Sequence, residues 1–233
     1  AQFDQVVEAL EECGIPHEVV GLGGLLHTPE VADLVALLWV VQDPTRGDRL
    51  MRLLTGPSCR LGPADLDGLG AWARERQRSG RDRRASDLSR DASERASIIE
   101  ALDDLPSARW VGEEGQTISP VALDRLAGLG SAVRRLRSLT GLGLAELAAE
   151  AEVSLGLDIE VLARPDWSPG AARAHLDAFA DVAATFAASA ERASLGGFLA
   201  WLDAAVEEER GLDLGWIEAR TDAAAADAQV AYK

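Results

Sequence analysis

The residues best suited to chemistry lie in a short turn, Thr55-Gly-Pro-Ser-Cys-Arg-Leu-Gly62. Gly62 is followed by Pro63, a favourable helix start because the first turn of a helix has no use for the N–H that proline lacks. Backbone N–H groups left free at such a start can bind an anion, and Arg60 adds a full positive charge. The turn therefore fits a phosphate group. The candidate contacts are Thr55, Gly56, Arg60, Leu61 and Gly62.

A second interpretation of this turn stays open on the residues alone. Asp65 and Asp67 follow in the first turn of the expected helix, where their carboxylates would repel a phosphate. An ordinary helix–helix connector with a chance arginine also explains the sequence.

The arginine-rich segment from Arg74 to Arg95 is a second candidate for phosphate binding. It is polar, contains serine and has few large apolar residues, which is typical of a mobile loop after a helix that ends near Gln77. Its arginines, Arg74 and Arg78 among them, could attract phosphates regardless of base sequence, with an affinity that falls as salt rises. The alternative is a solvated loop whose charges partly neutralise one another.

Other segments lack the partners that their chemistry would need. Gly21–Gly24 has neither the Lys-Ser/Thr of a phosphate-binding loop nor the spacing of a dinucleotide-binding turn, so we interpret it as a flexible crossing between subdomains. Asp158 and Glu160 fall in a stretch of alternating character, interpreted as extended, without a histidine to support acid–base or metal chemistry. We predict no catalytic, cofactor-binding or metal-binding residue in this chain.

The segment Leu136-Arg-Ser-Leu-Thr-Gly-Leu-Gly143 resembles a helix–hairpin–helix turn, which holds a phosphate on backbone amides. The usual proline is missing, and leucine stands where the second helix would carry alanine. A plain turn between two helices is therefore the better interpretation.

Helices must position these residues, because apolar side chains recur at helical spacing through most of the chain. Thr28-Pro29 opens one helix, which Asp43-Pro44 ends. The next, over 46–54, should turn its leucines inward and leave Arg46, Arg49 and Arg52 available outward. Further helices are expected over 63–77, 97–105, 119–136, 144–155, 171–192 and 195–210.

The fold class that follows is mainly α: a multi-helix, bundle-like subdomain with short β edges at its ends. His17–Val20 is β-branched and bounded by glycine, so it is expected to be a strand, and residues 229–233 resemble the lead-in to another. We expect a piece excised from a larger protein, because its only methionine is Met51 and it opens inside a helix-like pattern. Two strand-like ends that join one sheet would make it an insertion.

Charge is unevenly distributed along the chain. The net charge of −16 argues against nucleic acid, yet residues 46–95 hold 12 arginines and 8 acidic residues, against 11 basic and 31 acidic residues elsewhere. A basic segment on an acidic body can still meet a phosphate backbone locally. No apolar run reaches the roughly 20 residues that span a bilayer, and two cysteines fit no disulfide framework, so a cytoplasmic location is expected.

Residues 14–62 run through a short strand, a glycine break, the helix start Thr28-Pro-Glu30, a second helix and a basic turn. This order resembles the passage from the second motor domain into its helical insertion, called 2B, in superfamily 1A DNA helicases of the UvrD/PcrA/Rep family. Gly-Leu-Leu-His-Thr-Pro-Glu-Val and Leu-Leu-Thr-Gly-Pro look most similar to actinobacterial members, some of which also carry a nuclease domain. The resemblance is specific over about the first seventy residues, and beyond them it rests on order and helical character.

The resemblance implies an ATP-dependent 3′–5′ DNA helicase or translocase as the parent protein, with ATP and Mg²⁺ bound between its motor domains and no cofactor in this piece. Residues 1–24 would be the edge of the second RecA-like motor domain, 25–226 the 2B-type insertion and 227–233 the return. In the family, a Gly-Ile-Gly-type turn touches duplex DNA ahead of the fork. Here Arg60-Leu61-Gly62 replaces it, so the first glycine is missing and the contact is altered.

The partners implied by the resemblance are duplex DNA, the remaining helicase domains and protein partners, with single-stranded DNA for the parent and no membrane. The subdomain would rotate as a rigid body about Gly21–Gly24 to regulate unwinding. The alternative is a helical protein-interaction or autoinhibitory module that does not bind DNA and meets its partner through the acidic surface. In both cases the isolated piece is expected not to be catalytic.

Overall fold

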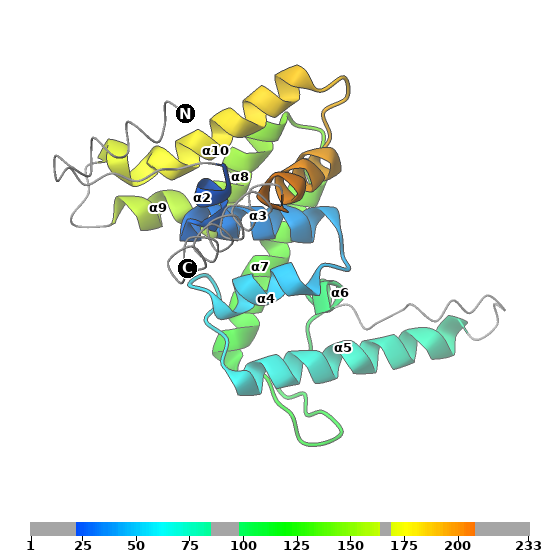
Figure 1. Cartoon of the computed structure of the whole chain (residues 1–233). Helices are drawn as coiled ribbons and strands as arrows, with labels where there is room; N and C mark the ends of the chain where they lie inside the picture. The colour runs from blue at the N-terminus through cyan, green and yellow to red at the C-terminus, as the bar shows by residue number, and fades with distance from the viewer. Residues whose placement is uncertain (1–21, 85–97, 164–168, 208–233) are drawn as a thin grey trace, which may run out of the picture.

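The computed structural model describes residues 22–84, 98–163 and 169–207, and its regular elements there are all helical (Figure 1). The mainly α prediction is therefore confirmed. The strand expected at 17–20 and the strand-like C-terminus lie outside the described residues. The helices are α2 (Leu22–His27), α3 (Pro29–Gln42), α4 (Gly47–Thr55), α5 (Pro63–Arg84), α6 (Ile98–Ala101), α7 (Pro120–Ser138), α8 (Leu144–Leu155), α9 (Leu157–Leu162) and α10 (Pro169–Ser189), followed by a helix over 195–207.

Helix α3 is the centre of the core. It packs against α2, α4, α7, α8 and α10. Its side chains are buried almost all round, as expected for a helix that is apolar on every face. The predicted ends are confirmed: Thr28 is the N-cap residue with Pro29 at the first turn, and the N–H of Asp43 donates to Trp39 O at 2.8 Å. The Thr28 hydroxyl does not cap α3 but donates to Leu25 O at 2.8 Å.

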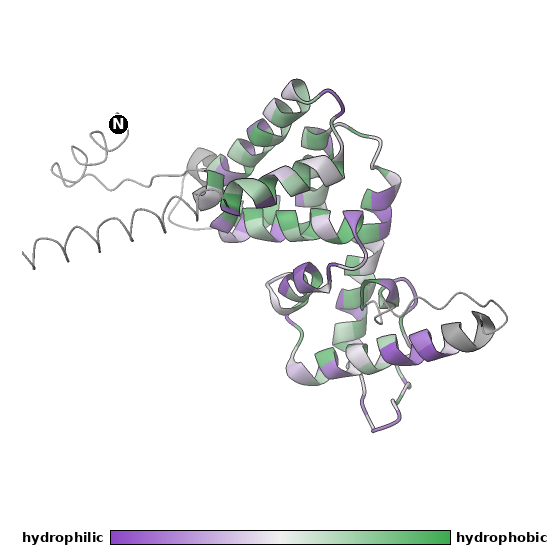
Figure 2. Cartoon of the chain, turned by 45° about the vertical axis from the view of Figure 1, so that its right-hand side comes forward, coloured by the Kyte–Doolittle hydropathy of each residue, from purple (hydrophilic) through white to green (hydrophobic). Residues whose placement is uncertain are grey.

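Helix α7 joins two parts of the molecule (Figures 1 and 2). Its C-terminal part lies with α3 and α8, and its N-terminal part extends toward α4 and α5. Three of its arginines donate to backbone carbonyls of other segments: Arg125 to Cys59, Arg134 to Leu102 and Arg137 to Val40 and Val41. Helix α5 lies at the far end from α10, and the second half of α5 is strongly hydrophilic.

The expected glycine crossing is wrong at Gly23 and Gly24, because both lie inside α2. Leu25 of α2 is buried in the core, and His27 Nδ1 lies 2.6 Å from Gly23 O one turn away. These contacts hold the glycines in a helix, so a hinge at Gly23–Gly24 is not supported by the fold. Gly21 lies outside the described residues.

The expected loop from Arg74 is also wrong, because α5 continues to Arg84. Arginine is a good helix former, and tertiary contacts hold this part of the helix. Trp72 Nε1 donates to Asp104 O at 2.7 Å, and Arg76, one turn later, pairs with the Asp104 carboxylate. The remainder of the arginine-rich segment, residues 85–97, lies outside the described residues.

The stretch after Gly156 is a helix, α9, and not the extended segment that the sequence suggested. Gly156 has φ +67°, a left-handed conformation that ends α8 and turns the chain. Leu157 and Val161, four residues apart, are both buried, while Ile159 between them is 72% exposed. Burial thus follows the helical period, and the alternation of apolar residues misled the prediction.

The other helix boundaries fall close to prediction. Helix α8 has the predicted limits, and α7 begins after Ser119, whose hydroxyl accepts from Ala122 N. Helix α6 is shorter than expected, and α10 begins two residues earlier and ends three residues earlier than the predicted 171–192. The Ser97 start of the expected 97–105 helix lies outside the described residues.

Candidate nucleic-acid interface

The turn between α4 and α5 is closed by its own backbone. Gly56 N donates to Arg52 O at 2.9 Å, Arg60 N donates to Gly56 O at 2.9 Å, and Leu61 N donates to Leu54 O at 2.8 Å. The side chains of Cys59 and Leu61 are buried in the core and anchor the turn. Arg60, between these two anchors, is exposed.

Arg60 is the one non-glycine residue with positive φ in the described part of the chain, at +50°. Such a conformation costs an arginine about 1–2 kcal/mol relative to ordinary backbone. Hydrogen bonds hold it in place: Arg60 Nε donates to Pro57 O at 3.1 Å, and Arg125 Nη1 donates to Cys59 O at 3.0 Å and to Arg60 O at 3.4 Å. Arg125 therefore brings a second positive charge to the turn.

Sequence reasoning missed Arg125. It belongs to α7 and lies 65 residues from Arg60 along the chain. Its position on the exposed side of an amphipathic helix gave no local signal, because only the packing of α7 against the turn brings it there.

The start of α5 offers free backbone donors. Leu66 N donates to Gly62 O at 3.1 Å, but within the described residues the N–H groups of Gly62, Ala64 and Asp65 have no protein acceptor. Gly62 is exposed, with open space where a side chain would stand. These N–H groups carry the positive end of the dipole of a 22-residue helix. A phosphate beside Arg60 would find donors there.

The Asp65 carboxylate, expected to repel a phosphate, is engaged elsewhere. It accepts from Ser119 N at 2.7 Å and from the Ser119 hydroxyl at 3.3 Å. Asp65 thereby places its charge at the N-terminus of α7, where the helix dipole favours an anion. We expect these bonds to weaken the repulsion between Asp65 and a phosphate at the start of α5. The exposed Asp67 carboxylate still carries its charge nearby.

The predicted contacts Thr55 and Gly56 face a different environment. They line a cavity of about 230 Å³ together with the carboxylates of Glu30, Asp33 and Glu160. The Thr55 hydroxyl donates to Met51 O at 2.8 Å. Burial is the main cause of a raised pKa for the Asp33 carboxyl, and the adjacent Arg52 guanidinium opposes it. This side of the turn is acidic and less suited to a phosphate.

The structure thus brings Arg60 and Gly62 together and separates them from Thr55 and Gly56. Leu61 lies between the two groups, but its side chain is buried and its N–H already donates to Leu54 O. Arg60 and Gly62 are the two predicted turn residues with groups free to meet a phosphate.

The three arginines of the α4 region, expected to be available outward, are all paired. Arg52 Nε lies 2.5 Å from Asp33 Oδ1, and Arg49 Nη2 lies 3.0 Å from Asp203 Oδ1. Arg46 bonds Asp48 and stacks over the Trp39 ring, 4.2 Å from its centroid. These ion pairs connect α4 to α3 and to the 195–207 helix, and the prediction is corrected accordingly.

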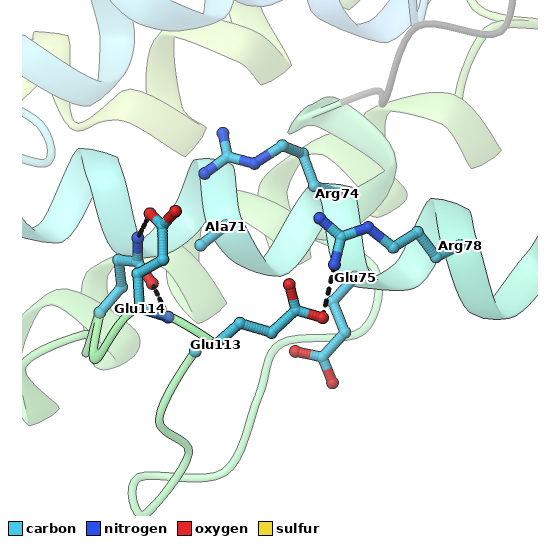
Figure 3. A pocket seen from close by; sticks show the side chains of 8 residues that line it. Ala71, Arg74, Glu75, Arg78, Glu113 and Glu114 are labelled. Atoms are coloured by element: carbon cyan, nitrogen blue, oxygen red, sulfur yellow. Dashed lines mark hydrogen bonds and ion pairs between the residues drawn. The ribbon is translucent and has the colours of Figure 1, made fainter.

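Arg74 and Arg78 share one face of α5 with Ala71 and Glu75. This face, together with Gly112, Glu113, Glu114 and Gln116, lines a cavity of about 90 Å³ (Figure 3). Arg78 Nη1 lies 2.6 Å from Glu113 Oε1. Arg74 forms no ion pair or hydrogen bond with any residue that the structure describes.

The other sequence candidates gain little from the structure. In the turn before α8, the N–H of Gly143 donates to Glu146 Oε2 at 3.2 Å, so a carboxylate already occupies the place that a phosphate would take. Burial raises the pKa of the Cys59 thiol to about 11, which keeps it protonated and unreactive. Across 22–84, 98–163 and 169–207, no group of three metal-ligating side chains occurs.

Comparison with known proteins finds a partial match. No protein-family model matches the chain. "ATP-dependent DNA helicase Rep" of Salmonella typhimurium strain LT2 is 35% identical over 65 residues, which are 28% of this chain and 10% of that protein. The helicase of the same name from Escherichia coli K12 matches to the same extent. This similarity supports a relation to UvrD/Rep-like helicases at the level of the family only, and the match spans about a tenth of these relatives' length.

Within the described helices, none is both long and apolar enough to cross a membrane.

Proposed function

We propose that this chain is an accessory subdomain of the 2B type from an ATP-dependent 3′–5′ DNA helicase or translocase, and that it contacts duplex DNA and regulates unwinding. The family-level relation to Rep and the mainly α fold support this proposal. ATP and Mg²⁺ would act in the motor domains of the parent, to which residues 1–24 and 227–233 would connect. A cytoplasmic location and an actinobacterial affinity belong to the same proposal.

The proposed DNA contact is supported by one observation: at the α4–α5 turn, two guanidinium groups lie beside backbone N–H groups that are free to donate. Arg60 and Arg125 lie beside the start of α5, where the N–H groups of Gly62 and Ala64 have no protein acceptor in the described structure. A phosphate oxygen can accept from such groups while the guanidinium groups neutralise its charge. The contact would position the duplex without reading its base sequence.

The neighbouring acidic residues indicate from which side of the turn DNA approaches. On the Thr55–Gly56 side of the turn, the three carboxylates of Glu30, Asp33 and Glu160 outnumber Arg52, the one cation that lines the same cavity, so their net charge would repel a phosphate backbone. We therefore infer that DNA approaches from the Gly62 side, along the start of α5.

The alternative, a helical protein-interaction or autoinhibitory module, is favoured by one observation. The net charge is −16, and Arg46, Arg49, Arg52 and Arg78 are each paired with a carboxylate of the chain itself. In this case a partner would meet the acidic surface, and DNA would not bind.

One titration separates the two functions. A labelled DNA duplex is titrated with the chain at two salt concentrations, and anisotropy reports binding. The helicase subdomain predicts saturable binding that weakens as salt rises, because phosphate contacts release counterions. The interaction module predicts no binding at either salt concentration.

A further inference from the structure

An acidic turn, residues 111–117, projects from the body beside α5 (Figure 1). Its sequence is Val111-Gly-Glu-Glu-Gly-Gln-Thr117. Gly112 N donates to Gln116 O at 2.8 Å, and Gly115 N donates to Gly112 O at 3.0 Å. Gly115 has φ +85°, which favours glycine at the tip. The turn is therefore a closed structure that carries Glu113 and Glu114 at its end.

Both ends of the acidic turn are fixed to α5. On one side the Trp110 ring packs edge-on against Trp72, with centroids 5.5 Å apart, and Trp110 Nε1 donates to Glu75 Oε2 at 2.9 Å. On the other side Thr117 passes so close to Gly68 that a Cβ there would lie 2.4 Å from Thr117 O. These contacts keep the tip over the arginine face of α5.

The tip places carboxylates against the arginines. Glu113 pairs with Arg78, while Glu114 accepts from Gln116 Nε2 at 3.0 Å (Figure 3). Two arginines and three glutamates line the cavity between α5 and the acidic turn. This face of α5 therefore has an excess of negative charge, although the helix itself is rich in arginine.

We propose that the acidic turn is a built-in competitor of DNA: Glu113 holds the Arg78 guanidinium, and a duplex phosphate gains Arg78 only by displacing Glu113. This inference rests on the proposed duplex contact at the α4–α5 turn. The side chains of Arg78 and Glu113 are 57% and 74% exposed, so solvent screens the pair and a phosphate can exchange with the carboxylate. The acidic turn thus limits the duplex contact in the intact chain to Arg60, its neighbours and Arg74.

The test compares four variants of the whole 233-residue chain with the wild type in titrations of a labelled duplex. These four are Glu113→Gln, Arg78→Gln, the double variant, and Glu191→Gln as control. A fifth variant, Arg60→Ala, is titrated beside them to test the duplex contact at the α4–α5 turn independently. Glu191 is exposed and follows the end of α10 by two residues, and Figure 1 shows α10 at the opposite end of the molecule from α5. The control therefore removes the same charge without touching the acidic turn. Thermal unfolding of each variant confirms that the fold is kept.

Glu113→Gln is expected to bind the duplex roughly three- to tenfold more tightly at low salt, since it frees one arginine and removes one repelling charge. Its salt dependence should steepen by about 0.9 in log–log slope, the value for one added phosphate contact. Arg78→Gln should change little by itself but cancel most of the gain in the double variant. Glu191→Gln should stay within about twofold of the wild type.

The other outcomes separate the two proposals. If Arg60→Ala weakens binding but Glu113→Gln behaves like Glu191→Gln, the proposal that Glu113 competes with DNA is wrong, while the proposed duplex contact is supported. The same proposal is also wrong if the Arg78→Gln change weakens duplex binding as much in the wild type as it does in Glu113→Gln. If neither the wild type nor Glu113→Gln binds the duplex, both proposals fall.

Discussion

Arg125 on α7 donates to the carbonyl oxygen of Arg60 at 3.4 Å and to that of Cys59 at 3.0 Å. Among the described residues, Arg60 is the one that adopts a left-handed conformation without being glycine. One guanidinium therefore both steadies a strained turn and adds charge beside the start of α5. The geometry of the candidate interface depends on a helix that follows it by more than fifty residues.

Arg125→Met should weaken duplex binding and loosen the turn. We expect a loss of about 1 kcal/mol in the free energy of unfolding, which is below the usual range for a hydrogen bond to a charged group because Arg125 is exposed. Urea denaturation measures it, with Arg109→Met, an exposed arginine of the 102–119 segment, as control. Equal stability of the two variants would show that the Arg125 bonds do not support the turn.

Arg60→Gly and Arg60→Ala should differ in stability although both remove the guanidinium. Glycine adopts positive φ freely, whereas alanine keeps the strain, so the glycine variant should be more stable by about 1 kcal/mol. Chemical denaturation of both variants gives the difference. An alanine variant that is as stable as the glycine variant would mean that Arg60 is not strained.

Gly68→Ala should destabilise the fold strongly. A Cβ at this position would lie 2.4 Å from Thr117 O and 2.8 Å from a side-chain carbon of Ile118, so α5 and the acidic turn must separate. We expect a loss of about 2–3 kcal/mol, as for overpacking in a core.

The matched control is Gly128→Ala in α7, where a Cβ meets nothing within 4 Å. This change should instead stabilise by about 0.5–1 kcal/mol, because alanine favours a helix interior. If both alanine variants unfolded at the same urea concentration, the close approach of Gly68 to Thr117 would be refuted.

Cys59 should make stability fall at high pH. Burial raises the pKa of its thiol from 9.0 to about 11. As pH rises, the unfolded chain therefore loses the thiol proton before the folded chain does. The free energy of unfolding keeps its full value below pH 9 and decreases as pH rises toward about 11. The slope is at most about 1.4 kcal/mol per pH unit.

Urea denaturation at pH 8 to 10.5 measures this slope against Cys59→Ala, which removes the titrating group. The wild type should lose stability faster than the variant above pH 9. Parallel curves for the two proteins would show that the thiolate is not disfavoured in the fold.

Sequence reasoning succeeded where the signal was local. Ser119-Pro120 marked the start of α7 because a hydroxyl cap and a proline act within one turn, and the apolar period of α7 marked its buried face. The Arg60–Gly62 turn was predicted in the same way, from a glycine and a proline next to an arginine, and its phosphate contact stays a prediction.

Sequence reasoning failed where a distant contact decided the outcome. Alternating residues near Ile159 suggested an extended strand, but the burial of Leu157 and Val161 made a helix. The hydrogen bonds from Ser119 to the Asp65 carboxylate and the pairing of Arg78 with Glu113 also join residues that no short motif connects. Such pairings follow from the packing of α5 and α7, which spacing along the chain does not reveal.

The most direct test of the duplex contact is the salt dependence of DNA binding with and without the Arg60 guanidinium. Arg60→Ala is compared with the wild type and with Arg192→Ala, an exposed arginine beyond α10. We expect Arg60→Ala to bind a labelled duplex about three- to tenfold more weakly at low salt and to lose about 0.9 in the log–log salt slope, while Arg192→Ala matches the wild type. Equal affinity and equal slope for Arg60→Ala and Arg192→Ala would contradict the proposed contact.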